Sequence, residues 1–158
     1  MYKSCAVTGS FDPITLGHVD LVDRAGKIFD KVYVLMLVNP DKEYTYSVEL
    51  RLEMVKAVFC SYKNVEVCYY DGYTADFCKS RGIEVLIRGV RDEKDFNYEK
   101  QLAKLNLEYG GLTTYFMYAS DELLDVSSSR AKMALKSGKI EEYMPKEAIK
   151  VLKEKTNG

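Results

Sequence analysis

The chain has 158 residues, of which 47% are hydrophobic and 30% charged, and its formal net charge is −1. This length and composition are typical of one soluble globular domain, spanning residues 1–158, with a core of its own. The near-neutral charge gives no electrostatic basis for binding nucleic acid or an acidic membrane. The longest apolar run, residues 32–38, is too short to cross a bilayer. We expect a cytoplasmic protein, because the N-terminus lacks the apolar core of a signal peptide.

The four cysteines give little support to a metal site. They are scattered along the chain, form no Cys-x-x-Cys pair and have no histidine beside them; they are Cys5, Cys60, Cys68 and Cys78. This spacing does not match a zinc site, and it favours reduced thiols in a cytoplasmic protein.

Hydrophobic patterning predicts strands that alternate with helices along the whole chain. The β-rich apolar runs that predict strands are residues 5–7, 31–38, 64–70, 83–87 and 113–118. Helical spacing of apolar residues predicts helices at about residues 19–29, 47–59, 73–81, 92–109, 127–137 and 145–154, with a loop at 120–125. This order indicates an α/β, Rossmann-like fold: a doubly wound, five-stranded parallel sheet with helices on both faces and right-handed crossovers. We expect the last two helices, at about 127–155, to pack on the same domain.

The most informative stretch is Gly-Ser-Phe-Asp-Pro-Ile-Thr-Leu-Gly-His at residues 9–18, between the first strand and the first helix. Its glycines allow the backbone to approach a ligand closely. His18, the only histidine, lies near the helix start, where unpaired N–H groups and a partial positive charge favour phosphate binding. His18 could instead be a surface residue at a helix end. The hydroxyls of Ser10 and Thr15 favour a phosphate contact.

Further polar segments follow the other predicted strands. Parallel sheets bind ligands beyond the carboxyl ends of their strands, so we expect these segments to meet at one edge. They are residues 9–18, Lys42, Tyr73–Thr74, Arg88–Arg91 and Ser127–Ser129. The arginines are the strongest of these candidates, because a guanidinium presents a fixed fork of donors that suits phosphate oxygens. A loop lysine, or serines that cap a helix, occur often without any ligand.

Other nucleotide and hydrolase motifs are absent from the sequence. It contains neither Gly-x-x-x-x-Gly-Lys-Ser/Thr nor Gly-x-Gly-x-x-Gly, so a P-loop and a dinucleotide fingerprint are both unsupported. A hydrolase could be assembled only through His18, and no Gly-x-Ser-x-Gly nucleophile elbow accompanies it.

Three motifs resemble a known family. Thr-Leu-Gly-His at residues 15–18 matches the T/H-x-G-H signature of the nucleotidyltransferase superfamily. The full string at 9–18, Leu-Ile-Arg-Gly-Val-Arg-Asp at 86–92 with Asp-Phe-x-Tyr-Glu at 95–99, and Val-Ser-Ser-Ser-Arg at 126–130 resemble the phosphopantetheine adenylyltransferases. The R-T-x-G-I-S-type signature of cytidylyltransferases is absent. The resemblance covers nearly the whole chain.

The resemblance implies transfer of the adenylyl group of ATP to 4′-phosphopantetheine, which yields dephospho-coenzyme A and pyrophosphate. It implies Mg²⁺ held mainly by the ATP phosphates, a homohexamer, and feedback inhibition by coenzyme A. The positions that match phosphopantetheine contacts are Ser10, Lys42, Thr74 and Arg88. Those that match ATP contacts are Ser10, Phe11, His18, Gly89, Val90, Arg91, Glu99, Leu123, Leu124, Asp125, Val126, Ser127, Ser128 and Ser129. His18, Lys42 and Arg91 match the catalytic groups, with His18 as the transition-state stabiliser.

The chain departs from the family pattern at a few positions. Ser10 stands where threonine is frequent, which keeps the hydroxyl. Val7-Thr8 replaces a Tyr-Pro pair, and Leu123–Asp125 replaces an aromatic-containing version, so the packing of adenine there can differ.

The implied mechanism is in-line attack by the phosphopantetheine phosphate on the α-phosphorus. A phosphate monoester has a second pKa of about 6, so the nucleophile needs neither a general base nor a covalent enzyme intermediate. Positioning and charge neutralisation are then the tasks of the protein. Two other functions stay open: a nucleotidyltransferase with a different acceptor, and a nucleotide-binding sensor or assembly protein without turnover.

Overall fold

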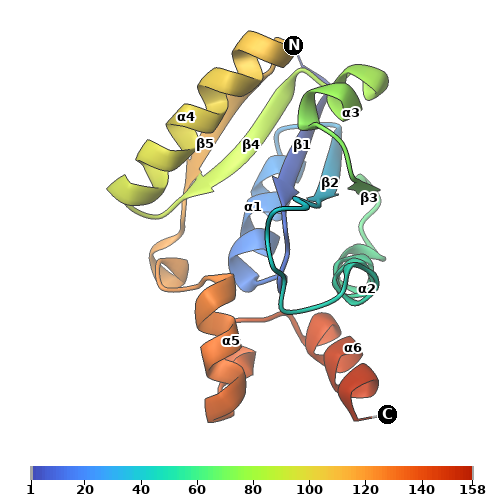
Figure 1. Ribbon diagram of the computed structural model, residues 1–158, viewed down its shortest axis with the longest axis vertical. Helices are drawn as coiled ribbons and strands as arrows, with labels where there is room; N and C mark the ends of the chain where they lie inside the picture. Colours follow the sequence, from blue (N-terminus) through green and yellow to red (C-terminus); the bar gives the residue numbers. More distant parts are fainter. Residues whose placement is uncertain (1, 158) are drawn as a thin grey trace.

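The computed structural model describes residues 2–157 and contains a five-stranded, all-parallel sheet with helices around it (Figure 1). The strand order is β3-β2-β1-β4-β5. The strands are β1 (Ser4–Gly9), β2 (Lys31–Leu37), β3 (Val65–Tyr70), β4 (Val85–Val90) and β5 (Thr113–Tyr118). The predicted α/β, Rossmann-like architecture is confirmed.

Six α-helices and two short 3₁₀ turns connect and follow the strands of the described chain. The helices are α1 (Leu16–Gly26), α2 (Val48–Phe59), α3 (Thr74–Arg81), α4 (Glu93–Gly110), α5 (Ser128–Ser137) and α6 (Lys146–Thr156). The 3₁₀ turns are η1 (Asp121–Leu123) and η2 (Ile140–Glu142). Within residues 2–157 no helix is both long and apolar enough to cross a membrane.

Alternation along the central strand creates a core on each face of the sheet. Cys5 and Val7 of β1 belong to the larger cluster, which also contains Val22 of α1, Met54 of α2 and Ile149 of α6. Ala6 faces the other way, into a smaller cluster with residues such as Phe77 of α3. Successive side chains of a strand point to opposite faces, so a strand covered on both faces is apolar throughout.

The structure corrects the predicted end of the fourth strand. Arg88, Gly89 and Val90 are the last residues of β4 and pair with Phe116, Met117 and Tyr118 of β5, whereas the sequence predicted that they follow the strand. Arginine and glycine have weak strand preference, so the pairing with β5, and not local propensity, extends the strand. The predicted loop at 120–125 also contains η1, which begins with a hydrogen bond from Leu123 N–H to the Ser120 carbonyl, 2.8 Å long.

Helix α4 is more exposed than its apolar spacing suggests. Phe96, Leu105 and Tyr109 recur at helical spacing, yet all three are exposed. Glu99 is the only fully buried residue of α4. Glu99 pairs with Arg88 of β4, and Phe96 packs edge-on against Phe116 of β5 with 5.5 Å between the ring centroids, so an ion pair and an aromatic contact both hold α4 against the sheet.

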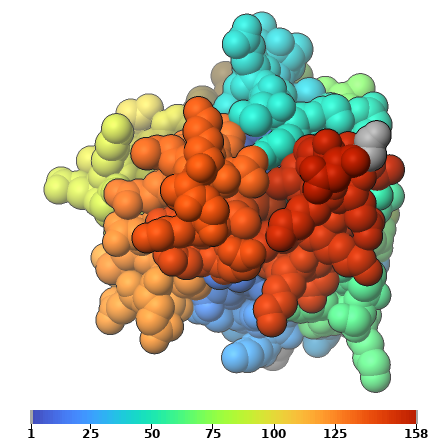
Figure 2. Space-filling model, turned by 90° about the horizontal axis from the view of Figure 1, so that it is seen from below, coloured from blue at the N-terminus to red at the C-terminus, as the bar shows by residue number. Residues whose placement is uncertain are grey.

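The chain changes direction across the sheet between β1 and β4. From β1 it passes to β2 and then β3 on one side, and it returns to β4 and β5 on the other side. The connections that leave the carboxyl ends of β1 and β4 therefore run in opposite directions. The crevice between them is the topological switch point, where parallel α/β sheets bind ligands. At this end of the molecule, α5 and α6 lie beside each other, and the segment between β2 and α2, in cyan, projects next to α5 (Figure 2).

Gly110 offers a test of how α3 and α4 pack. A Cβ at this position would lie 2.6 Å from the Cβ of Ala75, so Gly110→Ala must displace α4 from α3. We expect a loss of about 1–3 kcal/mol in the free energy of unfolding, measured by urea denaturation. Ala75→Gly should restore part of this loss in the double variant. A Gly110→Ala protein as stable as the parent would contradict the close packing.

Candidate active site

A cavity of about 510 Å³ opens at the carboxyl ends of β1 and β4. It is lined by residues from four of the five segments that the sequence selected. The predicted site residues that line it are Ser10, Phe11, His18, Lys42, Arg88, Gly89, Val90, Arg91, Leu123, Val126, Ser127, Ser128 and Ser129. Thr74, Glu99, Leu124 and Asp125 lie outside its lining. Thr74 begins α3, where its neighbour Ala75 packs against Gly110 at the end of α4.

His18 closes the N-terminus of α1 through a reciprocal capping box with Thr15. The Thr15 backbone N–H donates to His18 Nδ1 over 2.9 Å, and the His18 backbone N–H donates to Thr15 Oγ1 over 3.4 Å. Because Nδ1 accepts a hydrogen bond, the proton of the neutral ring resides on Nε2. The free nitrogen of His18 is therefore a hydrogen-bond donor.

The surroundings of His18 keep its ring neutral. Burial, then the positive charges of Arg88 and Arg91, lower the pKa of His18 from 6.5 to about 4. The ring of Phe11 packs edge-on against it, with 4.8 Å between the ring centroids. A neutral imidazole with its proton on Nε2 can donate to a phosphate oxygen, but it has no free basic nitrogen in this arrangement.

Arg88 connects the two strands of the switch point to α4. Its Nε and Nη2 donate to the two carboxylate oxygens of Glu99 over 2.8 and 2.7 Å, and its Nη1 donates to the carbonyl and, over 2.8 Å, the hydroxyl of Thr8. The register of β1 on β4 places Thr8 directly beside Arg88, because Val7 pairs with Ile87. Glu99 thus lies behind the cavity, and its bidentate contact fixes the plane of the guanidinium.

Arg91 joins the end of β4 to the serine-rich segment. Its Nε donates to Asp95 Oδ2 over 3.0 Å, and its Nη1 donates to the Val126 carbonyl over 3.4 Å. Asp95 is in the first turn of α4, where its charge also suits the helix N-terminus. Arg91 is therefore held at the cavity wall by two separate elements.

Two of the three serines build the local structure of the site. Ser127 caps α5, accepting from the Arg130 backbone N–H over 3.1 Å, and Ser128 Oγ donates to the Pro13 carbonyl over 2.8 Å. The second bond fastens the start of α5 to the 9–18 loop. Because α1 and α5 both begin at the cavity, two helix N-termini contribute partial positive charge to it.

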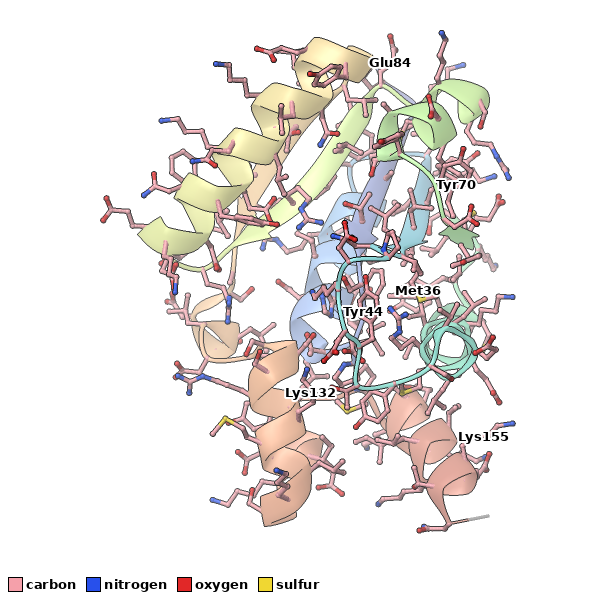
Figure 3. The ribbon with its side chains drawn as sticks, viewed as in Figure 1. Met36, Tyr44, Tyr70, Glu84, Lys132 and Lys155 are labelled. Atoms are coloured by element: carbon pink, nitrogen blue, oxygen red, sulfur yellow. The ribbon has the colours of Figure 1, made fainter. Side chains whose placement is uncertain are left out.

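Lys42 lies on the segment between β2 and α2. Its backbone N–H donates to the Asn39 carbonyl over 3.1 Å, and the Asn39 backbone N–H donates to Tyr44 Oη over 2.8 Å. Lys132 of α5 reaches the same segment, donating to Thr45 Oγ1 over 3.2 Å. Figure 3 shows Tyr44 on this segment and Lys132 on α5 across from it.

Sequence reasoning missed several polar residues of the cavity. The lining also contains Thr8, Asp12, Asp20, Arg24, Glu43 and Lys132. Arg24 Nη1 donates to the Tyr118 carbonyl over 2.8 Å and pairs with Asp20 at 3.4 Å, which joins α1 to the end of β5. The only sequence signal was the i,i+4 spacing of Asp20 and Arg24, which places them on one helix face without saying what that face meets.

The chain is similar in sequence to known proteins over almost its whole length. The family model described as cytidylyltransferase-like matches residues 6–134, which include every residue that lines the cavity. A protein of Clostridium perfringens (strain SM101 / Type A) named phosphopantetheine adenylyltransferase is 41% identical over 149 residues, which are 93% of this chain and 91% of that protein. A protein of the same name from Clostridium botulinum (strain 657 / Type Ba4) is 40% identical over 157 residues, 98% of this chain and 96% of that protein.

The chain belongs to the phosphopantetheine adenylyltransferase family. This membership confirms the resemblance drawn from the motifs at 9–18, 86–92 and 126–130. It leaves the role of each matched residue as a prediction.

The sole histidine of this family member makes the state of its imidazole directly measurable. In an untagged chain, NMR titration should give one histidine with a pKa of about 4 and the proton on Nε2 at neutral pH. Arg91→Ala should raise this pKa, because it removes one of the positive charges that lower it. A pKa near 6.5, or a proton on Nδ1, would show that the capping arrangement is wrong.

The same shift predicts the pH dependence of stability. The pKa of His18 is lower in the folded state than in the unfolded chain, so between pH 6.5 and about 4 the unfolded state binds more protons. The His18 contribution to the free energy of unfolding is therefore complete above pH 6.5 and falls as the pH falls toward 4. Denaturation of His18→Gln, which does not titrate, should lack this part of the pH dependence.

Proposed function

We propose that this chain transfers the adenylyl group of ATP to 4′-phosphopantetheine, forming dephospho-coenzyme A and pyrophosphate. The observation that carries the proposal is the gathering of His18, Lys42, Arg88 and Arg91 around one cavity at the switch point of the sheet, in a member of this family. Four such groups suit a reaction in which two phosphate-bearing substrates must be brought together against their mutual repulsion.

The acceptor phosphate binds at Ser10, Lys42 and Arg88 in this proposal. Arg88 is held by Glu99 and Thr8, so its charge is presented from a fixed position. Lys42 supplies a point charge from the opposite segment. Preorganised donors of this kind lose little conformational freedom when the substrate binds, so the entropic cost of aligning the two substrates is lower.

The chemical step is a single in-line displacement. An oxygen of the acceptor phosphate forms a bond to the α-phosphorus of ATP, while the bond from that phosphorus to the β-phosphate bridging oxygen breaks. Pyrophosphate departs with the electron pair. The attacking phosphate is largely a dianion at neutral pH, because its second pKa is about 6, so no proton needs to be removed by the enzyme.

His18 stabilises the α-phosphoryl group during this step. Its Nε2–H donates to a nonbridging oxygen, and the bond strengthens as negative charge accumulates there. The lowered pKa and the engaged Nδ1 both argue against a general-base role. The unpaired N–H groups at the start of α1 stabilise the same negative charge.

The nucleotide occupies the side of the cavity toward α5. Arg91 and the first turn of α5, with Ser127, Ser128 and Ser129, hold the phosphates. Apolar lining from Val90, Met117, Leu123 and Val126 offers a surface for the adenine base. Glu99, matched to an ATP contact by the resemblance, acts in this proposal through Arg88.

Mg²⁺ fits this site as an ion carried by the nucleotide. Of the three carboxylates that line the cavity, Asp12 accepts from the Thr45 and Tyr46 backbone N–H groups, and Asp20 is paired with Arg24. The third, Glu43, is exposed on the segment before α2. With two of the three carboxylates engaged, we propose the ATP phosphate oxygens as the main ligands. The ion would neutralise charge on the triphosphate and the departing pyrophosphate.

The homohexamer, inhibition by coenzyme A and a cytoplasmic location also remain proposals. Exposed apolar residues on α4 and β5 support association between copies; they include Tyr98, Leu107, Tyr109, Tyr115 and Tyr118. The four cysteines are free, which suits a reducing compartment.

The function is tested by measuring pyrophosphate release with ATP, Mg²⁺ and 4′-phosphopantetheine. Release with this acceptor, and not with other phosphorylated acceptors, supports the proposal. Release that requires a different acceptor indicates another nucleotidyltransferase. ATP binding without release under any of these conditions indicates a nucleotide sensor, and either result contradicts the proposal.

His18→Ala tests the assigned role of the histidine. We expect kcat to fall by about three orders of magnitude, while ATP affinity stays within about tenfold, because the lost contact is made chiefly in the transition state. Lys56→Ala, on the exposed side of α2, is the control and should match the parent. An alanine variant that keeps near-parental kcat would refute the role.

A further inference from the structure

Arg51 carries a positive charge into the interior of the protein at the first turns of α2. By residue volume, Arg51 is the largest fully buried side chain in residues 2–157, with 1% of its surface exposed. Within residues 2–157, no carboxylate forms an ion pair with it. Burial of a charge without a counter-charge is costly, so the contacts that Arg51 makes need an explanation beyond core packing.

The guanidinium of Arg51 bridges two segments that line the cavity. Its Nη1 donates to the Ser10 carbonyl over 2.8 Å, and its Nε donates to the Tyr46 carbonyl over 3.1 Å. Its central carbon lies 3.9 Å from the centroid of the Tyr44 ring, which is the distance of a cation–π contact. One side chain therefore fixes the 9–18 loop relative to the segment that carries Lys42.

Asp12 supplies a second connection between the same segments. Its carboxylate accepts from the backbone N–H groups of Thr45 and Tyr46, over 2.8 and 2.9 Å. At Tyr46 the N–H is thus bound by Asp12 and the carbonyl by Arg51. Backbone groups held on both sides leave little freedom for the segment before α2 to shift.

We propose that Arg51 is a positioning residue for the acceptor phosphate. It sets the separation between Ser10 and Lys42, and it does so without touching the substrate. This inference rests on the proposed function, in which Ser10 and Lys42 bind that phosphate. The unpaired charge of Arg51 also adds positive potential behind the site, at a place where two anions must approach.

Lysine is a poor substitute at this position. An ammonium is a compact point charge, whereas the Arg51 contacts need a planar fork that reaches two carbonyls and stacks on a ring. Arg51→Lys keeps the charge and removes this geometry. Arg51→Met keeps the length and apolar stem and removes both the charge and the planar fork. Tyr44→Leu removes the stacked ring together with the hydroxyl that accepts from the Asn39 N–H, so Tyr44→Phe, which removes the hydroxyl alone, is its control.

The experiment compares the KM values for the two substrates. For Arg51→Lys we expect the KM for 4′-phosphopantetheine to rise about tenfold or more, with the KM for ATP within about threefold, because ATP is also held by Arg91 and α5. Tyr44→Leu should shift the same parameter less. Arg81→Lys is the matched control: Arg81 also lies over an aromatic ring, that of Phe77, but lies outside the cavity lining.

A double-variant cycle separates positioning from general stability. If Arg51 acts through Lys42, then Arg51→Lys should raise the KM for 4′-phosphopantetheine much less in the Lys42→Ala background than in the parent. Each of three results would overturn the proposal. The first is an equal rise in the KM for 4′-phosphopantetheine in both backgrounds, the second is an equal change in the KM values for both substrates, and the third is a folded Arg51→Lys protein whose KM values match the parent. Failure of both Arg51→Lys and Tyr44→Leu to fold would assign Arg51 to the core alone. Absence of turnover in the parent itself would instead refute the proposed function.

Discussion

The site depends most on the Arg88 guanidinium between β1 and α4. Its contacts with Thr8 and Glu99 tie the two strands that diverge at the switch point to the helix that covers them. Burial lowers the pKa of His18 most, and the positive charges of Arg88 and Arg91 lower it further. One partly buried ion pair thus helps to fix the geometry of the cavity, and its cation contributes to keeping the ring of His18 neutral. Removal of Glu99 would leave a partly buried charge unpaired, which is the costly case for such pairs.

The charges of the site are local in a chain that is almost neutral overall. Cations converge on the cavity from β4, α5 and the segment before α2, and the N-termini of α1 and α5 add their dipoles. His18 stays neutral within this field, so it contributes a directed hydrogen bond without further positive charge. In the proposed reaction the two anionic substrates would meet fixed donors, whereas water would have to reorganise around them.

Much of the fold and part of the site could be predicted from the sequence. Continuous apolar runs such as residues 31–38 indicated strands buried on both faces, and the 9–18 motif placed His18 at a helix start because the pattern is local. The extension of β4 through Gly89, the pairing of Glu99 with Arg88, and the burial of Arg51 depend on partners distant in the sequence. No periodicity signals such contacts, so an isolated arginine in a helix appears in the sequence as a solvated residue.

In the proposed reaction the adenylyl group passes directly between the two bound substrates, without a covalent enzyme intermediate. The most direct measurement is the stereochemical course at the α-phosphorus, with ATP that carries a chiral α-thiophosphate as the donor and 4′-phosphopantetheine as the acceptor. A single in-line displacement predicts inversion of configuration in the product. Retention would require two displacements through an adenylylated enzyme, and it would contradict the account.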